Sequence, residues 1–410
     1  MHGIHVSSEI GKLKKVCLHR PGDELLNLTP DTLEELLFDD IPFLPVAQAE
    51  HDEFADALRG EGTEVVYLED LMTETLNNDP SLREKFLAQY IQEAGIATPE
   101  LEKIAYEALN SISDTKEFVL KTMAGLTKAE LGIKQTTATL AGLTDSEVSH
   151  LAVNPMPNLY FTRDPFATVG EGVSINRMYS VTRNRETIYG QYIFDNHPEY
   201  KGIDQIFNRY APNHIEGGDI LNINGTTLAI GISQRTQAAA IDIIAKNAFW
   251  NSQESKIETI LAINIPNNRA MMHLDTVFTQ IDYDKFTVHP GIFGTLQVFE
   301  LTKGSKEGEV KITELTDTLE NILSKYVGTA VTLIPCAGGD PLAAEREQWN
   351  DGSNTLAIAP GVICVYQRNN VTNEILDKAG LNLKVISSAE LSRGRGGPRC
   401  MSMPFVREDI

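Results

Sequence analysis

The sequence contains few cysteines and no long apolar run. Four cysteines occur in 410 residues, and no two of them form a C-x-x-C pair. This spacing argues against a disulfide framework and against a structural zinc site, because both use closely spaced cysteines. No apolar stretch is long enough to cross a bilayer, and residues 1–10 lack the basic start and apolar segment of a signal peptide. We therefore expect a reducing, cytoplasmic environment.

Basic residues are also scarce relative to acidic ones. The chain has 35 Lys and Arg against 57 Asp and Glu, which gives a formal net charge of −22. A surface this acidic repels nucleic acids and anionic membranes, so we expect neither as a partner. With 42% hydrophobic residues the chain can bury a sizeable core, and its length allows two or three domains.

One segment has a helical pattern throughout, from Ser81 to about His150. Its apolar residues recur at helical spacing, and Ser or Thr precedes Glu by three residues at three places. That spacing is typical of capping boxes. The three pairs are Ser81 with Glu84, Thr127 with Glu130, and Thr144 with Glu147. We predict an all-helical insertion over residues 76–150 and an α/β body over residues 1–75 and 151–410.

In the remaining sequence, a polar residue recurs just before a β-hairpin pattern. Asp164, Asp219, Asp275 and Asn354 each stand at such a place, and the first two gaps are 55 and 56 residues. Helical stretches that run into β-rich segments, such as 316–326 into 329–334, also recur. Near-equal spacing is typical of one unit repeated around an axis, which brings strand ends together at a central site. An ordinary α/β domain with coincidental spacing is the alternative.

Cys400 ends the segment "SRGRGGPRC", which is rich in glycine and arginine. Three glycines free the backbone, and Arg393, Arg395 and Arg399 bring positive charge close to the thiol. Cations and exposed amides stabilise a thiolate, so Cys400 is the candidate nucleophile. A flexible loop with an incidental cysteine is the alternative reading.

The other three cysteines fit structural roles better. Cys17 and Cys364 lie in apolar strand patterns, where a buried cysteine acts as a small hydrophobic side chain. Cys336, in "IPCAGGD", is the only competing nucleophile, but no arginine cluster adjoins it. We therefore assign the chemistry to the C-terminal cysteine.

Two histidine–carboxylate pairs share the spacing H-x-D or H-x-E. His273 precedes Asp275 by two residues, and His214 precedes Glu216 in the same way. On a strand, residues two apart share a face, so each pair is predicted to point into one space. H-x-D with a distant histidine, here His214 or His289, is also the pattern of a non-haem iron site. A metal site leaves the cysteine and the arginines without a role, so we expect none.

A third group of residues lies around the segment "NLYFTRDP". Asp164 follows Asn158 and Phe161, and the next residue, a proline, keeps the chain extended at Asp164. Further along, Arg183 and Arg185 are two residues apart and are predicted to share a strand face, and Arg235 follows a strand pattern. A solvated salt-bridge face is the ordinary explanation for arginines of this kind.

Taken together, these motifs resemble the bacterial arginine deiminase family, within the enzymes that modify guanidino groups. The segments "NLYFTRDP", "HIEGGD", "HLDTVF" and "GRGGPRCMSMPF" match in order over nearly the whole chain, and the helical insertion resembles that family too. The resemblance implies a five-bladed, pseudo-symmetric α/β propeller. It also implies hydrolysis of free L-arginine to L-citrulline and ammonia, in arginine catabolism, without a cofactor.

The resemblance assigns roles position by position. Cys400 matches the nucleophile and His273 the general acid/base. Asp164 and Asp275 match the carboxylates that hold the guanidinium, and Glu216 matches a further acidic partner. The substrate-binding positions match Asn158, Phe161, Arg183, Arg235 and Arg395, although Arg185 could be confused with Arg183.

The chemistry of a guanidinium agrees with these roles. The group is planar, permanently charged and resonance-stabilised, so water attacks it poorly. Paired carboxylates can fix its plane while sulfur attacks the central carbon and a nitrogen leaves as ammonia. One histidine can protonate that nitrogen and then activate water. Because an acidic pocket raises a thiol pKa, we expect the bound guanidinium to supply much of the thiolate stabilisation.

Several alternatives stay open at the level of sequence. Agmatine deiminase, methylarginine hydrolase and amidinotransferase act on related groups, although the helical insertion and the complete motif set favour arginine deiminase. A catalytically inactive binding protein would also be compatible with the scaffold. The oligomeric state is open as well, and a homo-oligomer is compatible with the sequence.

Overall fold

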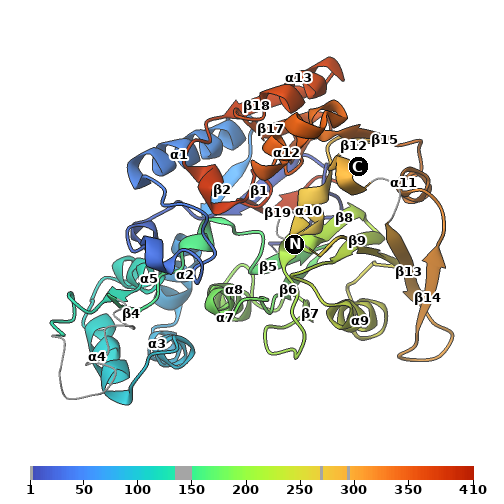
Figure 1. Ribbon diagram of the computed structural model, residues 1–410. Coiled ribbons are helices and arrows are strands. Elements are labelled where there is room, and N and C mark those ends of the chain that lie inside the picture. The colour runs from blue at the N-terminus through green and yellow to red at the C-terminus, as the bar shows by residue number, and fades with distance from the viewer. Residues whose placement is uncertain (1–2, 134–149, 268–270, 293–295) are drawn as a thin grey trace.

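The computed structural model describes residues 3–133, 150–267, 271–292 and 296–410. Figure 1 shows several small sheets with helices around them, and a group of helices from the first third of the chain at one side. The protein is therefore an α/β protein with mixed sheets. Within the described residues, no helix combines the length and apolar character that a membrane span requires.

Five sheets in the described chain share one topology. In each, two antiparallel strands are joined by a third strand that pairs in parallel with one of the two. The five units are β5 (Phe166–Val169), β6 (Gly172–Ile175) and β7 (Gln205–Phe207); β8 (Ile220–Asn224), β9 (Thr227–Ile232) and β10 (Thr259–Asn264); β11 (Phe278–Gln280), β12 (Lys285–Val288) and β15 (Thr332–Pro335); β16 (Leu356–Ala359), β17 (Val362–Tyr366) and β18 (Asn382–Ile386); and β19 (Met403–Arg407), β1 (Leu13–Leu18) and β2 (Glu64–Tyr67). The last unit combines both ends of the chain.

A helix connects each hairpin to its parallel third strand, as parallel pairing requires a crossover. These helices are α8 (Thr187–Asn196), α9 (Ala238–Lys246), α11 (Leu319–Val327), α13 (Asn370–Lys378) and α1 (Leu44–Gly60). The four helix-to-strand passages expected from the sequence lie at α1–β2, α9–β10, α11–β15 and α13–β18. Gly328 ends α11 in the left-handed conformation, with φ of 84°, which only glycine adopts without cost.

Three additions extend this repeated plan. The second sheet continues through β13 (Gln297–Lys303) and β14 (Val310–Leu315), which pair antiparallel beyond β10. Helix α12 (Pro341–Trp349) begins where the Asp340 carboxylate accepts the Ala343 N–H. Two short strands, β3 (Leu126–Thr127) and β4 (Leu151–Val153), also pair antiparallel.

The predicted insertion is built from helices in the part that the structure describes. They are α2 (Leu68–Asn78), α3 (Ser81–Glu93), α4 (Pro99–Asn110) and α5 (Thr115–Ala124), which gather at one side of Figure 1. The expected capping box at Ser81 is wrong, because the Asp79 carboxylate accepts both the N–H and the hydroxyl of Ser81. Thr127 and Glu130 do bond reciprocally, but at a turn after β3 rather than at a helix start. The Thr144–Glu147 pair, and the predicted insertion from 134 to 149, lie outside the described residues.

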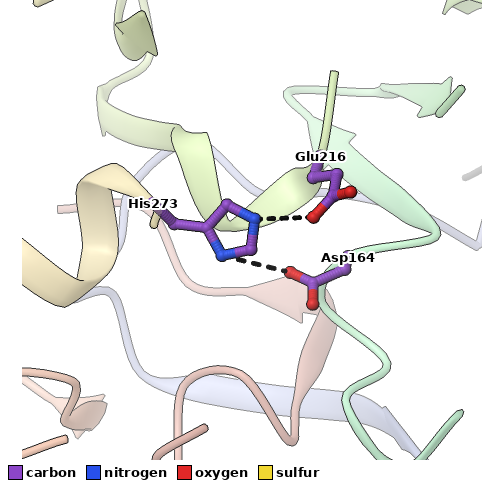
Figure 2. Close-up of side chains that lie close together, drawn as sticks. All are labelled: Asp164, Glu216 and His273. Carbon is purple, nitrogen blue, oxygen red and sulfur yellow. Dashed lines mark hydrogen bonds and ion pairs between the residues drawn. The ribbon is translucent and has the colours of Figure 1, made fainter. Parts of the chain in front are cut away.

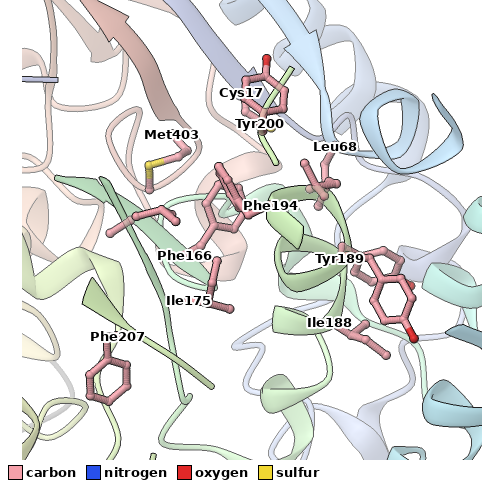
Figure 3. Close-up of a cluster of buried hydrophobic side chains, with 14 of the residues drawn as sticks. Cys17, Leu68, Phe166, Ile175, Ile188, Tyr189, Phe194, Tyr200, Phe207 and Met403 are labelled. Carbon is pink, nitrogen blue, oxygen red and sulfur yellow. The ribbon is translucent and has the colours of Figure 1, made fainter. Parts of the chain in front are cut away.

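The helices of this segment share their core with the sheets. Phe86 of α3 lies 5.7 Å from the Tyr189 ring and 5.3 Å from the Tyr192 ring of α8. The same apolar cluster continues through Phe166 and Phe194 toward Met403 (Figure 3). Helix α8 therefore connects the helical segment to the strands that lead to the candidate site.

Candidate active site

The chemically suggestive residues lie where the first strand of a unit begins. Asp164 precedes β5, Glu216 precedes β8 across a short turn, His273 and Asp275 precede β11, and Cys400 precedes β19. A pocket opens among these strand starts. Its lining consists of Leu37, Asn158, Phe161, Asp164, Arg183, Arg235, Met272, His273, Thr276, Gly394, Arg395 and Cys400. Every residue predicted for the site lines it except Glu216 and Asp275, which lie directly behind it.

The local structure at His273 differs from the strand that the H-x-D spacing predicted. His273 is the extended residue before α10 (Leu274–Val277), a single helical turn, and Asp275 lies inside that turn. The two side chains therefore do not share a strand face. His273 lines the pocket, whereas Asp275 turns toward Arg399 and Cys400.

The His273 ring is held between two carboxylates (Figure 2). Its Nε2 lies 2.7 Å from Glu216 Oε2, and its Nδ1 lies 3.9 Å from Asp164 Oδ1. Burial lowers the pKa of His273, but the charges of Asp164 and Glu216 outweigh burial and raise it to about 9. The ring is therefore a buried imidazolium that has a proton to donate.

Two glycines permit this approach, as expected from the motif "HIEGGD". A Cβ at Gly218 would stand 2.7 Å from Cγ of the His273 ring, and a Cβ at Gly217 would stand 1.9 Å from the Arg163 carbonyl oxygen. Both positions are therefore closed to larger residues. The glycines let the Glu216 segment pack directly against the ring.

Asp164, Glu216 and His273 are side-chain types that can bind a metal ion. One ligand atom each from Asp164, Glu216 and His273 lies within 4.8 Å of the others, which is close enough to surround a cation. A histidine ligand, however, needs an unprotonated nitrogen, and both ring nitrogens here face carboxylates. The iron pattern weighed from the sequence is not assembled, because His214 Nδ1 meets the Arg235 carbonyl oxygen and His289 lines a different pocket.

Cys400 is buried beside Asp275. Its Sγ lies 3.7 Å from Asp275 Oδ2, and its backbone N–H donates to Asn354 Oδ1 at 3.1 Å. Burial raises the pKa of the Cys400 thiol well above its usual range, the charges of Asp275, Asp164 and Asp351 raise it further, and Arg399 opposes them. The direction matches the expectation for an empty acidic pocket.

The loop arginines before Cys400 have partners of their own. Arg393 pairs with Asp40 and Glu390, Arg395 Nη1 lies 3.3 Å from Asp39, and Arg399 bridges Glu9 and Asp275. The charge of each of these arginines is therefore largely balanced by a neighbouring carboxylate, which leaves little of it to stabilise the thiolate. The expectation that this cluster alone would lower the thiol pKa is wrong.

Each of the two aspartates keeps one unused oxygen. Asp164 Oδ2 accepts Arg183 Nη1 at 2.9 Å, and Asp275 Oδ2 accepts Arg399 Nη1 at 2.8 Å. Oδ1 of each carboxylate is buried and has no hydrogen-bond partner among the described residues. An unsatisfied buried carboxylate oxygen is costly, so a pair of them indicates a place for a ligand with N–H donors.

The arginines predicted to bind substrate differ in their surroundings. Arg183 lies in the single helical turn α7 (Val181–Asn184), so the strand face predicted for Arg183 and Arg185 is wrong. Arg183 lines the pocket but is already paired with Asp164 and Glu186. Arg185 points elsewhere, donating to the Asn154 carbonyl oxygen, which separates the two candidates that the sequence could not. Arg235 lies 3.7 Å from Glu216, and its buried Nε has no partner within the described chain.

Arg395 and Phe161 also line the pocket. Arg395 has a positive φ of 64°, and its guanidinium carbon lies 3.5 Å from the centre of the Trp349 ring. The Phe161 ring packs against the Tyr160 ring, with ring centres 4.0 Å apart and a tilt of 37° between the rings. A Cβ at Gly396 would stand 2.3 Å from Phe161, so this glycine is needed for close packing.

Sequence reasoning missed several residues of the pocket. Leu37, Met272 and Thr276 line it, but apolar and small polar residues carry no chemical signal in a sequence. The sequence placed Asn354 just before a predicted hairpin, but it gave no indication that the Asn354 side chain would bond to the backbone of Cys400. Cys336 lies outside this pocket, where burial raises its pKa to about 11.

Comparisons with known proteins converge on one family. The family model described as arginine deiminase matches residues 34–407. The chain is 62% identical to the arginine deiminase of Treponema denticola over 99% of each chain. It is 53% identical to that of Clostridium perfringens, over 99% of this chain and 98% of that protein.

Solved structures add a likeness in fold. The amidinotransferase SxtG from Microseira wollei has a TM-score of 0.54 at 13% identity, covering 100% of this chain and 98% of that one. A dimethylarginine dimethylaminohydrolase adduct with S-methyl-L-thiocitrulline has a TM-score of 0.50 at 15% identity, covering 96% of this chain and 100% of that one. These similarities concern the α/β fold alone.

Proposed function

The chain belongs to the arginine deiminase family, and on that premise we propose how its pocket hydrolyses free L-arginine to L-citrulline and ammonia. The observation that carries the proposal is the pair of buried Oδ1 atoms on Asp164 and Asp275, which accept no hydrogen bond within the described residues and lie near His273 and Cys400. A guanidinium offers N–H donors in a fixed plane, and two carboxylates can bind it through forked hydrogen bonds. Substrate would then complete the unsatisfied bonds of the pocket.

The first half of the reaction forms a covalent adduct. The bound cation balances the aspartates, so Cys400 loses its proton more readily, and its thiolate attacks the central guanidinium carbon. His273 donates its proton to one terminal nitrogen, the C–N bond breaks, and ammonia leaves. An amidino group remains on sulfur. Glu216 holds the ring in place from its Nε2 side.

The second half returns the enzyme to its starting state. His273, now neutral, removes a proton from water, and the water oxygen attacks the amidino carbon. The C–S bond then breaks, the hydroxyl proton of the adduct passes to the departing Cys400 sulfur, and the ureido group of citrulline is released. The same histidine thus serves as acid and then as base.

The remaining pocket residues suit the amino-acid end of the substrate. Arg235 and Arg395 both line the pocket, and the buried Nε of each lacks a hydrogen-bond partner within the described residues, so we assign both to an α-carboxylate. Asn158 and Phe161 complete this part of the lining. Arg183 contacts the pocket with its charge balanced, so we assign it to the orientation of Asp164.

Replacement of the nucleophile tests the mechanism. Cys400→Ser should abolish citrulline formation while still binding arginine, and rapid-quench mass spectrometry of the wild type should detect an amidino adduct on Cys400. Cys336→Ser is the matched control, because it removes another buried cysteine outside the pocket and should keep turnover. Unchanged turnover in Cys400→Ser would show the covalent mechanism to be wrong.

A substrate series tests the assignment of the two arginines. Agmatine lacks the carboxylate, so Arg235→Ala should raise KM for arginine and leave the slow reaction with agmatine unchanged. Ammonia and citrulline from arginine, compared with products from agmatine and methylarginine, measure this selectivity.

Full activity after exhaustive chelation is expected, and its loss would favour the metal alternative.

We further propose that the five units form a five-bladed, pseudo-symmetric α/β propeller made of residues 1–75 and 151–410, with residues 76–150 as the helical insertion. Their common topology supports this arrangement, as do the strand starts gathered at one pocket.

A cytoplasmic location is supported by four free, buried cysteines. Light scattering would determine whether the protein forms a homo-oligomer.

A further inference from the structure

Four polar residues stand at equivalent places in the repeated units, just before the hairpin. Asp164 and Asp275 each keep an unpartnered oxygen, whereas Asp219 and Asn354 have side-chain oxygens that accept backbone N–H groups. Asp219 Oδ1 accepts the Leu274 N–H at 2.8 Å. Asn354 Oδ1 accepts the Cys400 N–H at 3.1 Å. Asp164, which lines the pocket, and Asp275, which lies beside Cys400, therefore each keep an oxygen without a hydrogen bond, whereas Asp219 and Asn354 bond the next unit.

The other oxygen of Asp219 bonds a second segment of the site. Its Oδ2 accepts the Ser233 hydroxyl at 2.7 Å and the Thr236 hydroxyl at 2.6 Å. These two residues flank Arg235, and Leu274 directly follows His273. One fully buried carboxylate thus joins the turn that carries Arg235 to the backbone beside His273.

Asn354 forms the corresponding bridge at the nucleophile. Its Nδ2 donates to the Asp275 carbonyl oxygen at 3.2 Å, while its Oδ1 accepts the Cys400 N–H. The side chain is fully buried. A single amide thus spans the backbones of the residue that attacks and of a carboxylate that grips the guanidinium.

We propose that Asp219 and Asn354 are positioning residues for this reaction, one holding His273 and Arg235 and the other holding Cys400 and Asp275. The inference rests on the roles proposed above for His273 and Cys400. It follows from the sensitivity of covalent catalysis to geometry, since a displacement of about 1 Å can cost on the order of 100-fold in rate. Neither residue contacts the reacting atoms.

Truncations and conservative changes separate positioning from folding. Asp219→Ala and Asn354→Ala should each lower kcat by roughly 10- to 100-fold. Asp219→Asn keeps an oxygen for the Leu274 N–H, and Asn354→Asp keeps one for the Cys400 N–H. Each conservative variant should recover at least half of the lost kcat on a logarithmic scale. Asn224→Ala, at the far end of β8, removes an amide that bonds the Tyr326 carbonyl oxygen and should keep the wild-type kcat.

The two positioning residues should affect different steps. Rapid-quench mass spectrometry measures formation and decay of the amidino adduct. Asn354→Ala should slow formation and spare decay, because only formation needs the thiolate to attack. Asp219→Ala should slow both, because His273 acts in both. Ser233→Ala, which loosens only the Arg235 turn, should raise KM and keep kcat within about threefold.

The outcomes are distinguishable from failure of the proposed function. If Cys400→Ser turns over arginine, the covalent mechanism is wrong and the positioning roles are wrong with it. If Cys400→Ser is inactive while Asp219→Ala and Asn354→Ala keep wild-type kinetics, only the positioning roles are wrong. Equal losses in the alanine and conservative variants, with melting temperatures lowered in parallel, would also contradict them, because a purely structural role predicts that result.

Discussion

At the scale of single residues, the site is dominated by negative charge near a thiol. Burial raises the pKa of Cys400 most, the charges of three aspartates raise it further, and Arg399 opposes them. The histidine beside it is an imidazolium, because carboxylates face both of its nitrogens. An empty pocket of this kind keeps the thiol protonated, so the substrate itself takes part in activation.

This arrangement predicts a thiol pKa that depends on occupancy. Binding of a non-reactive arginine analogue should lower the apparent pKa of Cys400, because its cation balances Asp164 and Asp275. The ultraviolet absorbance of the thiolate, measured against pH and corrected with Cys400→Ser, reports the value directly. The same pKa with and without the analogue would refute substrate-assisted ionisation.

The sequence identified reactive residue types better than their pairing. Cys400, His273 and the aspartates stand out because few other roles suit them beside glycines and arginines. Their hydrogen-bond partners lie far away in the chain, as with Glu216 and His273, so no local pattern predicts them. The strand predicted at His273 became a single helical turn, whose first N–H is accepted by the distant Asp219.

At the scale of elements, α1 buries a histidine without hydrogen bonds. His51 lies between the rings of Phe54 and Tyr67, and neither ring nitrogen meets a partner in the described chain. Burial lowers the pKa of His51 to about 3, from an ordinary value of 6.5. Below about pH 6.5, His51 therefore binds a proton in the unfolded chain but stays neutral in the folded chain.

Stability should consequently fall as the pH drops from about 6.5 toward 3, by up to ~1.4 kcal/mol per pH unit from this group. His51→Leu should make the fall in unfolding free energy between pH 7 and pH 5 shallower. Urea unfolding at several pH values measures it, with His150→Gln as an exposed control that should keep the wild-type slope. An unchanged slope in His51→Leu would mean that other groups cause the acid sensitivity.

The helices α2–α5 depend on α8 for their core, and Phe86 is the principal contact. Its ring meets Tyr90, Phe118, Tyr189 and Tyr192, and it is fully buried. Phe86→Ala should lower the free energy of unfolding by about 3–5 kcal/mol through the lost contacts and the cavity. Leu120→Ala, on the partly exposed face of α5, should cost far less in the same urea titration. Similar costs for both would contradict a shared core.

Elements that follow from a pattern of neighbouring residues were predicted well. Elements that depend on pairing between distant parts of the chain were not. The passage from α11 to β15 follows from helical spacing, a glycine and a β-rich segment, all within twenty residues. The β13–β14 extension of the second sheet had no such signal, because its pairing with β10 depends on residues far apart in the chain.

At the scale of the whole molecule, a buried ion network joins the two ends of the described chain. Glu9 accepts Arg399 Nε at 3.0 Å, and Arg163 and Arg407 lie close enough to influence it. Burial raises the pKa of Glu9, but these three arginines outweigh burial and lower it to about 2. Its charge stabilises the fold above an ordinary pKa of about 4.5, and this contribution disappears as the pH falls toward 2.

Removal of the Glu9 charge should therefore affect stability strongly. Glu9→Gln leaves buried arginines without their counter-charge and should cost about 3–5 kcal/mol. Glu408→Gln removes an exposed carboxylate paired with Lys14 and should cause no measurable loss. Thermal and urea unfolding compare the two variants. A small loss in Glu9→Gln would show that Asp275 alone balances Arg399.

The pairing of β1 with β19 has a consequence for biosynthesis. The ribosome makes β1 long before its antiparallel partner β19, because the two strands lie far apart in the sequence. At ~5–20 residues per second, β1 keeps one unpaired edge for tens of seconds, and Cys400 emerges only at the end of that time. Nascent chains are therefore exposed to edge-to-edge association on polysomes. They also lack Cys400 until shortly before β19 is made, so catalysis cannot begin before this part of the chain has been synthesised.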